Sequence, residues 1–250
     1  MKKIKALLFG GILLFLPAAP AAAQELLVST AASLSNAMNS VKAEFEQLNP
    51  GVRVTVNYAS SGALFRQIKQ GAPVDVYASA NPQWMNEAVQ GGFVQGDEAV
   101  IFAHNTLVLA VPAANRAAVA KTEDLKGERV RRIGVGTPTT VPAGAYAKTA
   151  LTDLGLWEEL LPKLIFAENV RQVLDYVRRG EVDAGLMYAT DAARGGERVK
   201  VVATLSLPQP VSYSVASLKD SREPELAGRF VQFILSDQGQ EILAGHGFKR

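Results

Sequence analysis

The sequence predicts an α/β protein of two lobes, each a βα sheet sandwich, with a cleft between them. Short apolar runs alternate with helical patterns along the chain, as in parallel sheets that helices cover on both faces. A glycine that ends a helix and leads into a strand through Val-Asp occurs at residues 71–75 and again at 180–183, so the two halves echo each other. The length is also sufficient for two lobes of about 100 residues each.

Residues 1–23 have the pattern of a cleavable secretion signal. Three lysines precede the apolar run 6–16, and small residues ending at Ala23 form a cleavage site. The apolar run is too short to span a membrane, and no later segment approaches the ~20 apolar residues that a span needs. The chain has no cysteine, which excludes disulfides and a lipid anchor on a lipobox cysteine. We therefore expect a free periplasmic protein.

The charge balance does not point to a polyanionic partner. Without residues 1–23 the chain has 23 Lys and Arg against 24 Asp and Glu, a net charge of −1. This balance is not typical of binding to nucleic acid or to an anionic membrane. Two isolated histidines without a cysteine cannot supply a usual zinc site. We expect no cofactor, no nucleic acid and a monomer.

The first part of the chain is expected to form lobe 1, residues 24–104. Apolar or alternating runs bounded by turn residues predict its strands, and the first three of them lead into amphipathic helix patterns. The strong turn Asn49-Pro50-Gly51 separates the first helix from the second strand. The predicted strands are 26–28, 52–58, 74–80 and 100–103, and the predicted helices begin near 33, 61 and 82.

The rest of the chain is expected to form lobe 2, residues 105–207, and then to return to lobe 1 with residues 208–250. The same patterns predict the elements of both segments. The predicted strands are 107–111, 132–136, 163–167, 182–191, 199–203 and 211–217, and the predicted helices are 142–154, 169–179, 225–235 and 238–243. Two crossings between the lobes make a hinge, which we expect near His104 and near residues 206–211.

Four helix starts have a composition that suits an anion. They are Ser33, Ser61, Pro142-Ala143 and Asn169-Val170, two from each lobe. The first backbone N–H groups of a helix have no partner inside the helix, and the helix dipole is positive at that end. Parallel strands place such helix starts beyond the same edge of a sheet, where ligands bind. Four starts offer on the order of +2 charges, enough for a dianion without a fixed cation.

Other residues near these helix starts have less specific patterns. Pro142 fits the first helical position, and the small Ala143 and Gly144 are expected to let a ligand approach the backbone amides. We interpret Arg171 as a solvent-facing side chain, while Tyr188 is equally a core residue or a hydrogen-bond donor. Ser35 and Ser60 are interpreted as helix and turn residues rather than ligands.

Five motifs resemble the periplasmic molybdate-binding protein of ABC importers, in order over essentially the whole mature chain. They are Ala31-Ala32-Ser33-Leu34, Ala59-Ser60-Ser61-Gly62-Ala63-Leu64, the run 141–148, Glu168-Asn169-Val170-Arg171 and Gly185-Leu186-Met187-Tyr188. The resemblance implies the two-lobe periplasmic binding protein fold (type II) with the ligand in the interlobe cleft. It also implies molybdate or tungstate as the ligand, bound as the oxyanion, and the membrane permease of an ABC transporter as the partner.

The resemblance further implies which residues bind the oxyanion. Ser33 and Ser61 bind it through their hydroxyls and amides. Ala143 and Val170 bind it through their backbone amides, and Tyr188 binds it through its hydroxyl. One departure is that Gly62 stands where some members of the family have a third serine. The lobes are expected to close around the dianion, and a smaller dianion such as sulfate cannot reach all the donors at once.

Other functions are less consistent with the residues. An enzyme with a serine nucleophile needs a base, but neither His104 nor His246 lies in a motif, and no Gly-x-Ser-x-Gly segment is present. A binding protein for another oxyanion, such as sulfate or phosphate, is the main alternative, and a phosphate site would need a carboxylate such as Asp191. A ferric site would need more ligands than Tyr188, and a sensory domain would need a DNA-binding or membrane segment.

Overall fold

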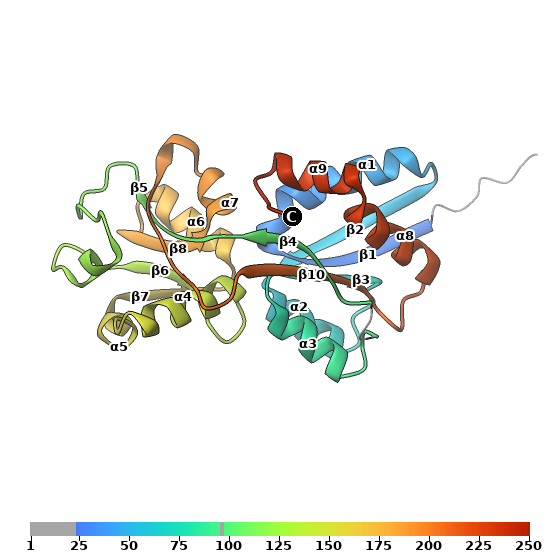
Figure 1. The fold of residues 1–250 in the computed structure, drawn as a ribbon, viewed down its shortest axis with the longest axis horizontal. Helices are drawn as coiled ribbons and strands as arrows, with labels where there is room; N and C mark the ends of the chain where they lie inside the picture. Colours follow the sequence, from blue (N-terminus) through green and yellow to red (C-terminus); the bar gives the residue numbers. More distant parts are fainter. Residues whose placement is uncertain (1–23, 96–97) are drawn as a thin grey trace, which may run out of the picture.

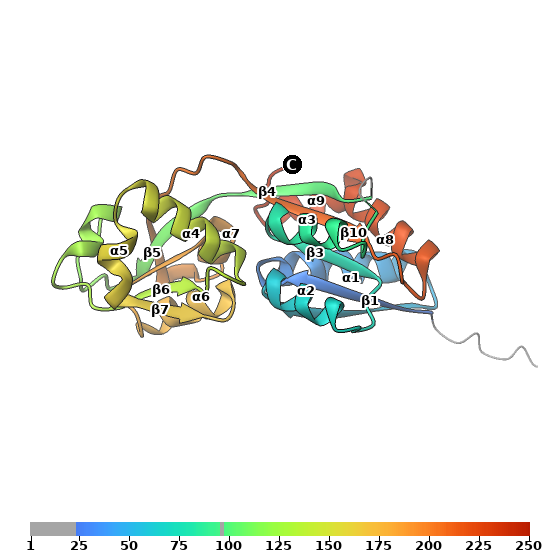
Figure 2. The same cartoon turned by 90° about the horizontal axis from the view of Figure 1, so that it is seen from below.

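The computed structural model describes residues 24–95 and 98–250, and the predicted secretion signal lies outside these residues. The chain forms two five-stranded mixed sheets, each covered by helices on both faces (Figure 1). The two sheets lie side by side along the long axis of the molecule, and a view turned by 90° shows them as separate layered bodies (Figure 2). We refer to them as sheet A and sheet B.

Sheet A has the strand order β2-β1-β3-β10-β4. Strand β1 is parallel to β2 and β3, whereas β10 is antiparallel to β3 and β4. The strands are β1 (Gln24–Ala31), β2 (Val52–Ala59), β3 (Val76–Ser79), β4 (Val100–Asn105) and β10 (Val211–Ser217). The helices are α1 (Ser35–Leu48), α2 (Ser61–Lys69), α3 (Pro82–Gln90), α8 (Pro224–Leu235) and α9 (Asp237–Gly245).

The helices divide between the two faces of sheet A. Helices α1, α8 and α9 lie on one face, and α2 and α3 lie on the other (Figure 1). On the first face Phe45 of α1 meets Phe230 of α8 edge to face, with ring centroids 5.0 Å apart. Burying these apolar stripes against the sheet stabilises each helix more than its own propensity does. The C-terminal helices therefore complete the body that begins with β1.

Sheet B has the strand order β7-β6-β8-β5-β9. Strand β6 is parallel to β7 and β8, and β5 is antiparallel to β8 and β9. The strands are β5 (Leu107–Pro112), β6 (Ile133–Gly136), β7 (Leu164–Ala167), β8 (Ala184–Tyr188) and β9 (Val199–Thr204). The helices are α4 (Pro142–Asp153), α5 (Trp157–Leu160), α6 (Val170–Arg179) and α7 (Ala189–Ala193), and the 3-10 turns are η1 (Ala32–Leu34), η2 (Thr122–Lys126), η3 (Leu161–Lys163) and η4 (Gly196–Arg198).

The predicted strands and helices are confirmed with one clear correction. The prediction of a strand over 182–191 is wrong at its end, because β8 stops at Tyr188 and residues 189–193 form the short helix α7. The apolar run misled the prediction, since alanine fits a strand end by hydrophobicity but favours a helix by propensity. The correction places Asp191 in the short helix α7 instead of in a strand.

Gly144 has a different role from the expected one. A Cβ atom at this position would lie on the carbonyl oxygen of Gly136 in β6, so the glycine lets α4 pack directly against the strand. Gly144 does not line the cavity described below. The expectation that Gly144 opens the backbone to a ligand was therefore wrong, and its close contact is with the chain itself.

This contact predicts a large effect of Gly144→Ala on stability. The added methyl group must push α4 away from β6, and overpacking of this kind costs about 1–3 kcal/mol. We expect the free energy of unfolding, measured by urea denaturation, to fall by that amount. Gly228→Ala in α8 is the matched control, because a Cβ there meets open space. It should stabilise the helix by roughly 0.5–1 kcal/mol. Equal effects of the two substitutions would contradict this packing role.

Candidate functional site

A small cavity lies between sheet A and sheet B, where the helix starts predicted from the sequence meet. The centre of a water-sized sphere has only about 10 Å³ available in it, so in this structure it has room for little more than one water molecule. The five predicted ligand residues Ser33, Ser61, Ala143, Val170 and Tyr188 all line it. The other lining residues are Ala31, Ala32, Ser60, Ala80, Val141, Pro142 and Asn169.

Two serines approach the cavity from the body of sheet A. Strand β1 ends at Ala31 and passes into the turn η1, so Ser33 lies in a 3-10 turn just before α1 instead of capping it. Strand β2 ends at Ala59, and Ser61 is the first residue of α2. The cap of α2, Ser60, makes no side-chain hydrogen bond to the helix within the described chain. The first amides of α2 are therefore not occupied by a side-chain cap.

Two helices approach the cavity from the body of sheet B. Pro142 is the first residue of α4, as predicted, and its cap Val141 has no side chain able to accept a hydrogen bond. Ala143 follows, fully buried. In α6 the cap is Asn169, whose Oδ1 accepts from the Gln172 amide at 3.1 Å, and Val170 is the first helical residue. Both helices thus point the positive ends of their dipoles at the cavity.

Tyr188 completes the lining at the end of β8. It is buried, and its hydroxyl donates to the carbonyl oxygen of Ala80 at 3.4 Å, across the boundary between the two sheets. Burial raises the pKa of the Tyr188 phenol well above its ordinary value of 10. The phenol therefore stays protonated at any physiological pH, and its one proton must turn from Ala80 to the cavity to donate to a ligand.

The lining contrasts with a site built on fixed cations. Of the residues that the structure describes, those lining the cavity carry no Lys, Arg, Asp or Glu. They offer hydroxyl groups and the amides of helix first turns. Donors of this kind in a dry pocket stabilise a negative charge more than the same donors exposed to water, because the local dielectric constant is low. The arrangement suits a small anion.

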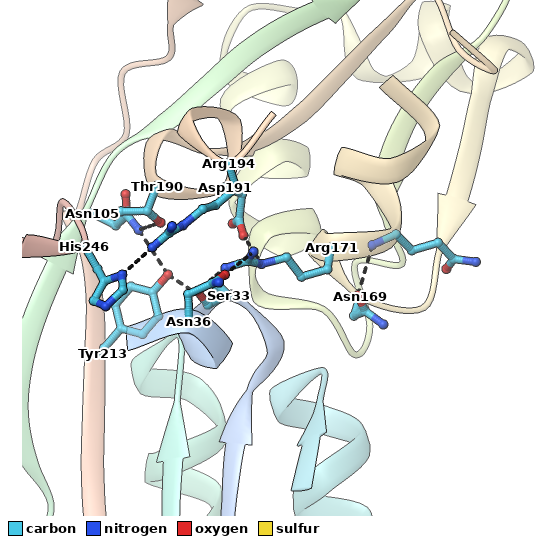
Figure 3. A network of polar contacts seen from close by, with 11 residues as sticks. Ser33, Asn36, Asn105, Asn169, Arg171, Thr190, Asp191, Arg194, Tyr213 and His246 are labelled. Carbon is cyan, nitrogen blue, oxygen red and sulfur yellow. Dashed lines mark hydrogen bonds and ion pairs between the residues drawn. The ribbon is translucent and has the colours of Figure 1, made fainter. Parts of the chain in front are cut away.

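Arg171 is not the solvent-facing residue that the sequence suggested. Its Nε forms an ion pair with Asp191 Oδ1 at 2.6 Å, and its side chain is only 22 % exposed (Figure 3). The other guanidinium nitrogens donate to Asn36 Oδ1 at 2.8 Å and to the backbone oxygen of Ser33 at 3.0 Å. Arg171 therefore connects α6 of sheet B to α1 and the turn η1 of sheet A. The earlier interpretation missed this because all its partners are distant in sequence.

Asp191 is equally committed to this connection. Its side chain is fully buried beside Arg171 and does not line the cavity. Burial raises the pKa of the Asp191 carboxyl to about 7, against the opposing effect of Arg171. The carboxylate that a phosphate site would need is thus already paired with an arginine.

Further contacts hold the two bodies together around the cavity. The amide of Gly62 donates to the carbonyl oxygen of Thr140 at 3.0 Å, from α2 to the loop before α4. A Cβ at Gly62 would lie 2.5 Å from Trp84 Cζ2 and 2.8 Å from that oxygen, so only glycine permits the contact. On the opposite flank Arg194 contacts His246 of the C-terminal tail (Figure 3). These contacts join distant segments of the two bodies near the cavity.

The sequence did not predict the roles of three residues at the site. Ser60 lines the cavity although it was interpreted as a turn residue, and Ala80 lines it at the end of β3. Tyr213 of β10 donates from its hydroxyl to Ser33 Oγ at 3.1 Å, beneath the cavity. The position of Ser60 beside Ser61 was the one available signal. Nothing in the local sequence connects Tyr213 to Ser33, 180 residues away.

Larger hollows elsewhere do not have the character of this cavity. One on the outer side of sheet A contains Asp75, but its carboxylate already accepts from the amides of Leu27 and Arg222 and from the Ser221 hydroxyl. Within residues 24–95 and 98–250 no cluster of three or more His, Asp or Glu could hold a metal ion. Over the same residues no helix has the length and hydropathy to cross a membrane.

The chain is similar to known solute-binding proteins over almost its whole length. The family model described as bacterial extracellular solute-binding protein matches residues 26–249. The molybdate-binding protein ModA of Escherichia coli (strain K12) is 38 % identical over 250 residues, covering 96 % of this chain and 95 % of that protein.

Solved structures share the fold. The periplasmic molybdate-binding protein of Azotobacter vinelandii superimposes with a TM-score of 0.77 at 23 % identity, covering 90 % of this chain and 99 % of that chain. The sulfate-binding protein SubI of Mycobacterium tuberculosis H37Rv superimposes with a TM-score of 0.78 at 18 % identity, covering 90 % and 86 %. The fold alone therefore does not decide which anion a protein binds.

The buried Asp191 predicts a specific pH dependence of stability. Its pKa is 3.8 in the absence of shifts and about 7 in the folded chain, so between these values the folded state keeps a proton that the unfolded state has lost. The stabilisation from this group is full at low pH and is lost as the pH rises through about 7. We expect the difference in free energy of unfolding between Asp191→Asn and the natural chain to change with pH. As the pH rises from about 5 to 8, the natural chain loses this stabilisation and the variant does not, so the stability of Asp191→Asn relative to the natural chain should increase. Urea denaturation at each pH measures this difference.

Asp124→Asn is the control for this experiment. The amides of Ala120 and Lys121 lower the pKa of Asp124, so this carboxyl is ionised in both states across the same pH range. Its substitution should change stability by a constant amount. A constant difference for Asp191→Asn as well would contradict the raised pKa of Asp191.

Proposed function

The chain belongs to the bacterial extracellular solute-binding protein family, and we propose that it binds molybdate, and also tungstate, in the periplasm for delivery to the membrane permease of an ABC transporter. Proteins of this family bind solutes, so the enzyme considered from the sequence is set aside. The expected two-lobe type II periplasmic binding protein fold is confirmed by the similar solved structures. The identity of the ligand is the part that we propose.

One observation carries the proposal. Ser33, Ser61, Ala143, Val170 and Tyr188 come from five separate places in 156 residues of chain, yet all five line one small, uncharged cavity. The resemblance to molybdate-binding proteins implies the same five residues. The 38 % identity to ModA of Escherichia coli supports the same ligand.

The physical chemistry of the cavity suits a tetrahedral dianion. The starts of α2, α4 and α6 each contribute roughly half a positive charge, and the hydroxyls of Ser33, Ser61 and Tyr188 add donors without adding a fixed charge. An anion must fill the cavity to reach donors from both bodies at once. We propose that size therefore selects molybdate and tungstate over sulfate, because each donor that a smaller ion leaves unsatisfied costs about 1–3 kcal/mol.

Another oxyanion remains the alternative function. Sulfate is a dianion without a proton, and the sulfate-binding SubI has a similar fold. Phosphate is less consistent with the site, because Asp191 pairs with Arg171 instead of facing the cavity. Binding measurements with molybdate and sulfate distinguish the two assignments.

We also propose where the protein acts and how it encloses and delivers its ligand. Residues 1–23 serve as the export signal that directs the chain to the periplasm. Residues 24–104 with 208–250 form one lobe and 105–207 the other, and the lobes hinge near His104 and residues 206–211. The closed form, with ligand, is the form that we expect the permease to recognise.

Calorimetric titration of the ligand-free protein tests the proposed ligand. We expect molybdate to bind with micromolar affinity or better, and sulfate more weakly by at least ~3 kcal/mol, about a hundredfold. Ser61→Ala should weaken molybdate binding by about tenfold, because it removes a buried donor. Ser40→Ala, outside the cavity, should leave it unchanged. Equal affinities for molybdate and sulfate would contradict selection by size, and no binding of molybdate would overturn the assignment.

Gly62 predicts that closure and affinity are linked. In Gly62→Ala the added Cβ must displace Trp84 or Thr140, which opens the contact between α2 and the loop before α4. We expect molybdate affinity to fall by about tenfold, the equivalent of an overpacking cost of 1–3 kcal/mol. Gly228→Ala, in open space on α8, is the control for a glycine-to-alanine change. Unchanged affinity in Gly62→Ala would show that this contact is not needed for the closed form.

A further inference from the structure

A series of hydrogen bonds runs from Asn105, at the end of β4, to the cavity. Asn105 Nδ2 donates to the Tyr213 hydroxyl oxygen at 3.3 Å, and the Tyr213 hydroxyl donates to Ser33 Oγ at 3.1 Å (Figure 3). Ser33 in turn lines the cavity. Tyr213 and Ser33 are both buried, so solvent does not compete for these bonds.

Asn105 determines which group donates and which accepts in this series of hydrogen bonds. Its Oδ1 accepts from the amide of Thr106 at 2.8 Å, which orients the side-chain amide. The opposite Nδ2 group then faces Tyr213 and also donates to Thr190 Oγ1 at 2.8 Å. An amide nitrogen cannot accept a hydrogen bond. Tyr213 must therefore accept from Asn105 and give its own proton to Ser33.

These hydrogen bonds affect the direction in which the hydroxyl proton of Ser33 points. Because Ser33 Oγ accepts from Tyr213, the proton of Ser33 has to point elsewhere, and the cavity is one of two spaces that Ser33 lines; the other is bordered by the donors Arg171 and Arg194. Burial raises the pKa of Tyr213 well above its ordinary value, with a smaller contribution from Asp191, so the phenol remains a donor. The hydroxyl of Ser33 is thus committed to donating towards the ligand.

Ser61 is oriented in the same way by a different group. The backbone amide of Ala80 donates to Ser61 Oγ at 3.0 Å, and an amide N–H has no other role. The proton of Ser61 must also point away from that bond. Ser33 and Ser61, two of the three serines that line the cavity, are therefore held as donors by groups beneath them, and for Ser33 that group is a side chain that can be changed.

We propose that Asn105 and Tyr213 are positioning residues that hold the Ser33 hydroxyl as a donor, and that they thereby make the cavity discriminate against oxyanions that carry a proton. This inference rests on the proposed function. A fully ionised tetrahedral dianion accepts from every donor. A protonated dianion of similar size needs an acceptor for its own O–H. The hydrogen bonds from Asn105 to Tyr213 and from Tyr213 to Ser33, which we call the relay, remove Ser33 from that role.

Hydrogen arsenate is the probe that isolates this property. At about pH 8 it is a tetrahedral dianion close to molybdate in size, but it carries one proton. The quantity to measure is the ratio of the dissociation constants of hydrogen arsenate and molybdate, by calorimetry. For the natural chain we expect a ratio of at least about a hundredfold.

Tyr213→Phe removes the donor to Ser33 and leaves the ring in place. Ser33 can then accept from a protonated ligand, so we expect the ratio to fall by about tenfold or more, while molybdate itself binds more weakly. Loss of packing alone would weaken both dianions alike and leave the ratio unchanged. Tyr58→Phe is the control, because that hydroxyl bonds Asn39 away from the cavity and its loss should not change the ratio.

Asn105→Asp is the second variant and keeps the test decisive if Tyr213→Phe does not fold. A carboxylate accepts the Tyr213 proton, so Ser33 donates to Tyr213 and becomes an acceptor towards the cavity. Its charge repels both dianions equally, and the ratio should again fall. An unchanged ratio in the folded variants would overturn the relay while molybdate binding stands. Failure of the natural chain to bind molybdate would overturn the proposed function itself.

Discussion

The burial of negative charge without a buried cation is the constraint on which the proposed site depends. An anion removed from water loses strong hydration, and a lysine or arginine would repay this loss but would bind many anions alike. Here the cavity instead gathers the starts of α2, α4 and α6 with the hydroxyls of Ser33, Ser61 and Tyr188. Helix starts of this kind can converge only at the carboxyl ends of parallel strands. The parallel cores of sheets A and B therefore exist, in functional terms, to aim helix ends at a common point.

The arginine close to the cavity serves a different purpose. Arg171 does not line the cavity; it bonds Asp191 within its own body, and Asn36 and the backbone oxygen of Ser33 in the other body. Its charge is compensated by a buried carboxylate, and its remaining donors bridge the two bodies. Removing either Arg171 or Asp191 would leave the other charge buried and unpaired. The cost of that unpaired charge is larger than the stability that the intact pair contributes. The pair thus acts as a structural connection beside the site and not as the counter-ion of the ligand.

Most of the fold and the lining of the site could be predicted because they depend on local patterns. Ser61, Ala143 and Val170 each follow an apolar strand and open a helix, and a helix start is encoded within a few residues. The roles of Arg171, Tyr213 and Asn105 could not be predicted in this way, since their partners are distant along the chain. The end of β8 failed for a related reason: an alanine-rich continuation of a buried strand has the same hydrophobicity whether it extends or coils.

The division of the donors between two bodies links affinity to conformation. Ser33 and Ser61 belong to the body of sheet A, while Ala143, Val170 and Tyr188 belong to that of sheet B. Neither group alone surrounds an anion, so an open form offers only part of the hydrogen bonds of the closed form. A ligand shifts a conformational equilibrium by the difference between its affinities for the two states. An ion that engages both groups therefore stabilises closure by the same free energy that closure adds to its binding. A partner that pulls the bodies apart weakens the site without touching the ligand.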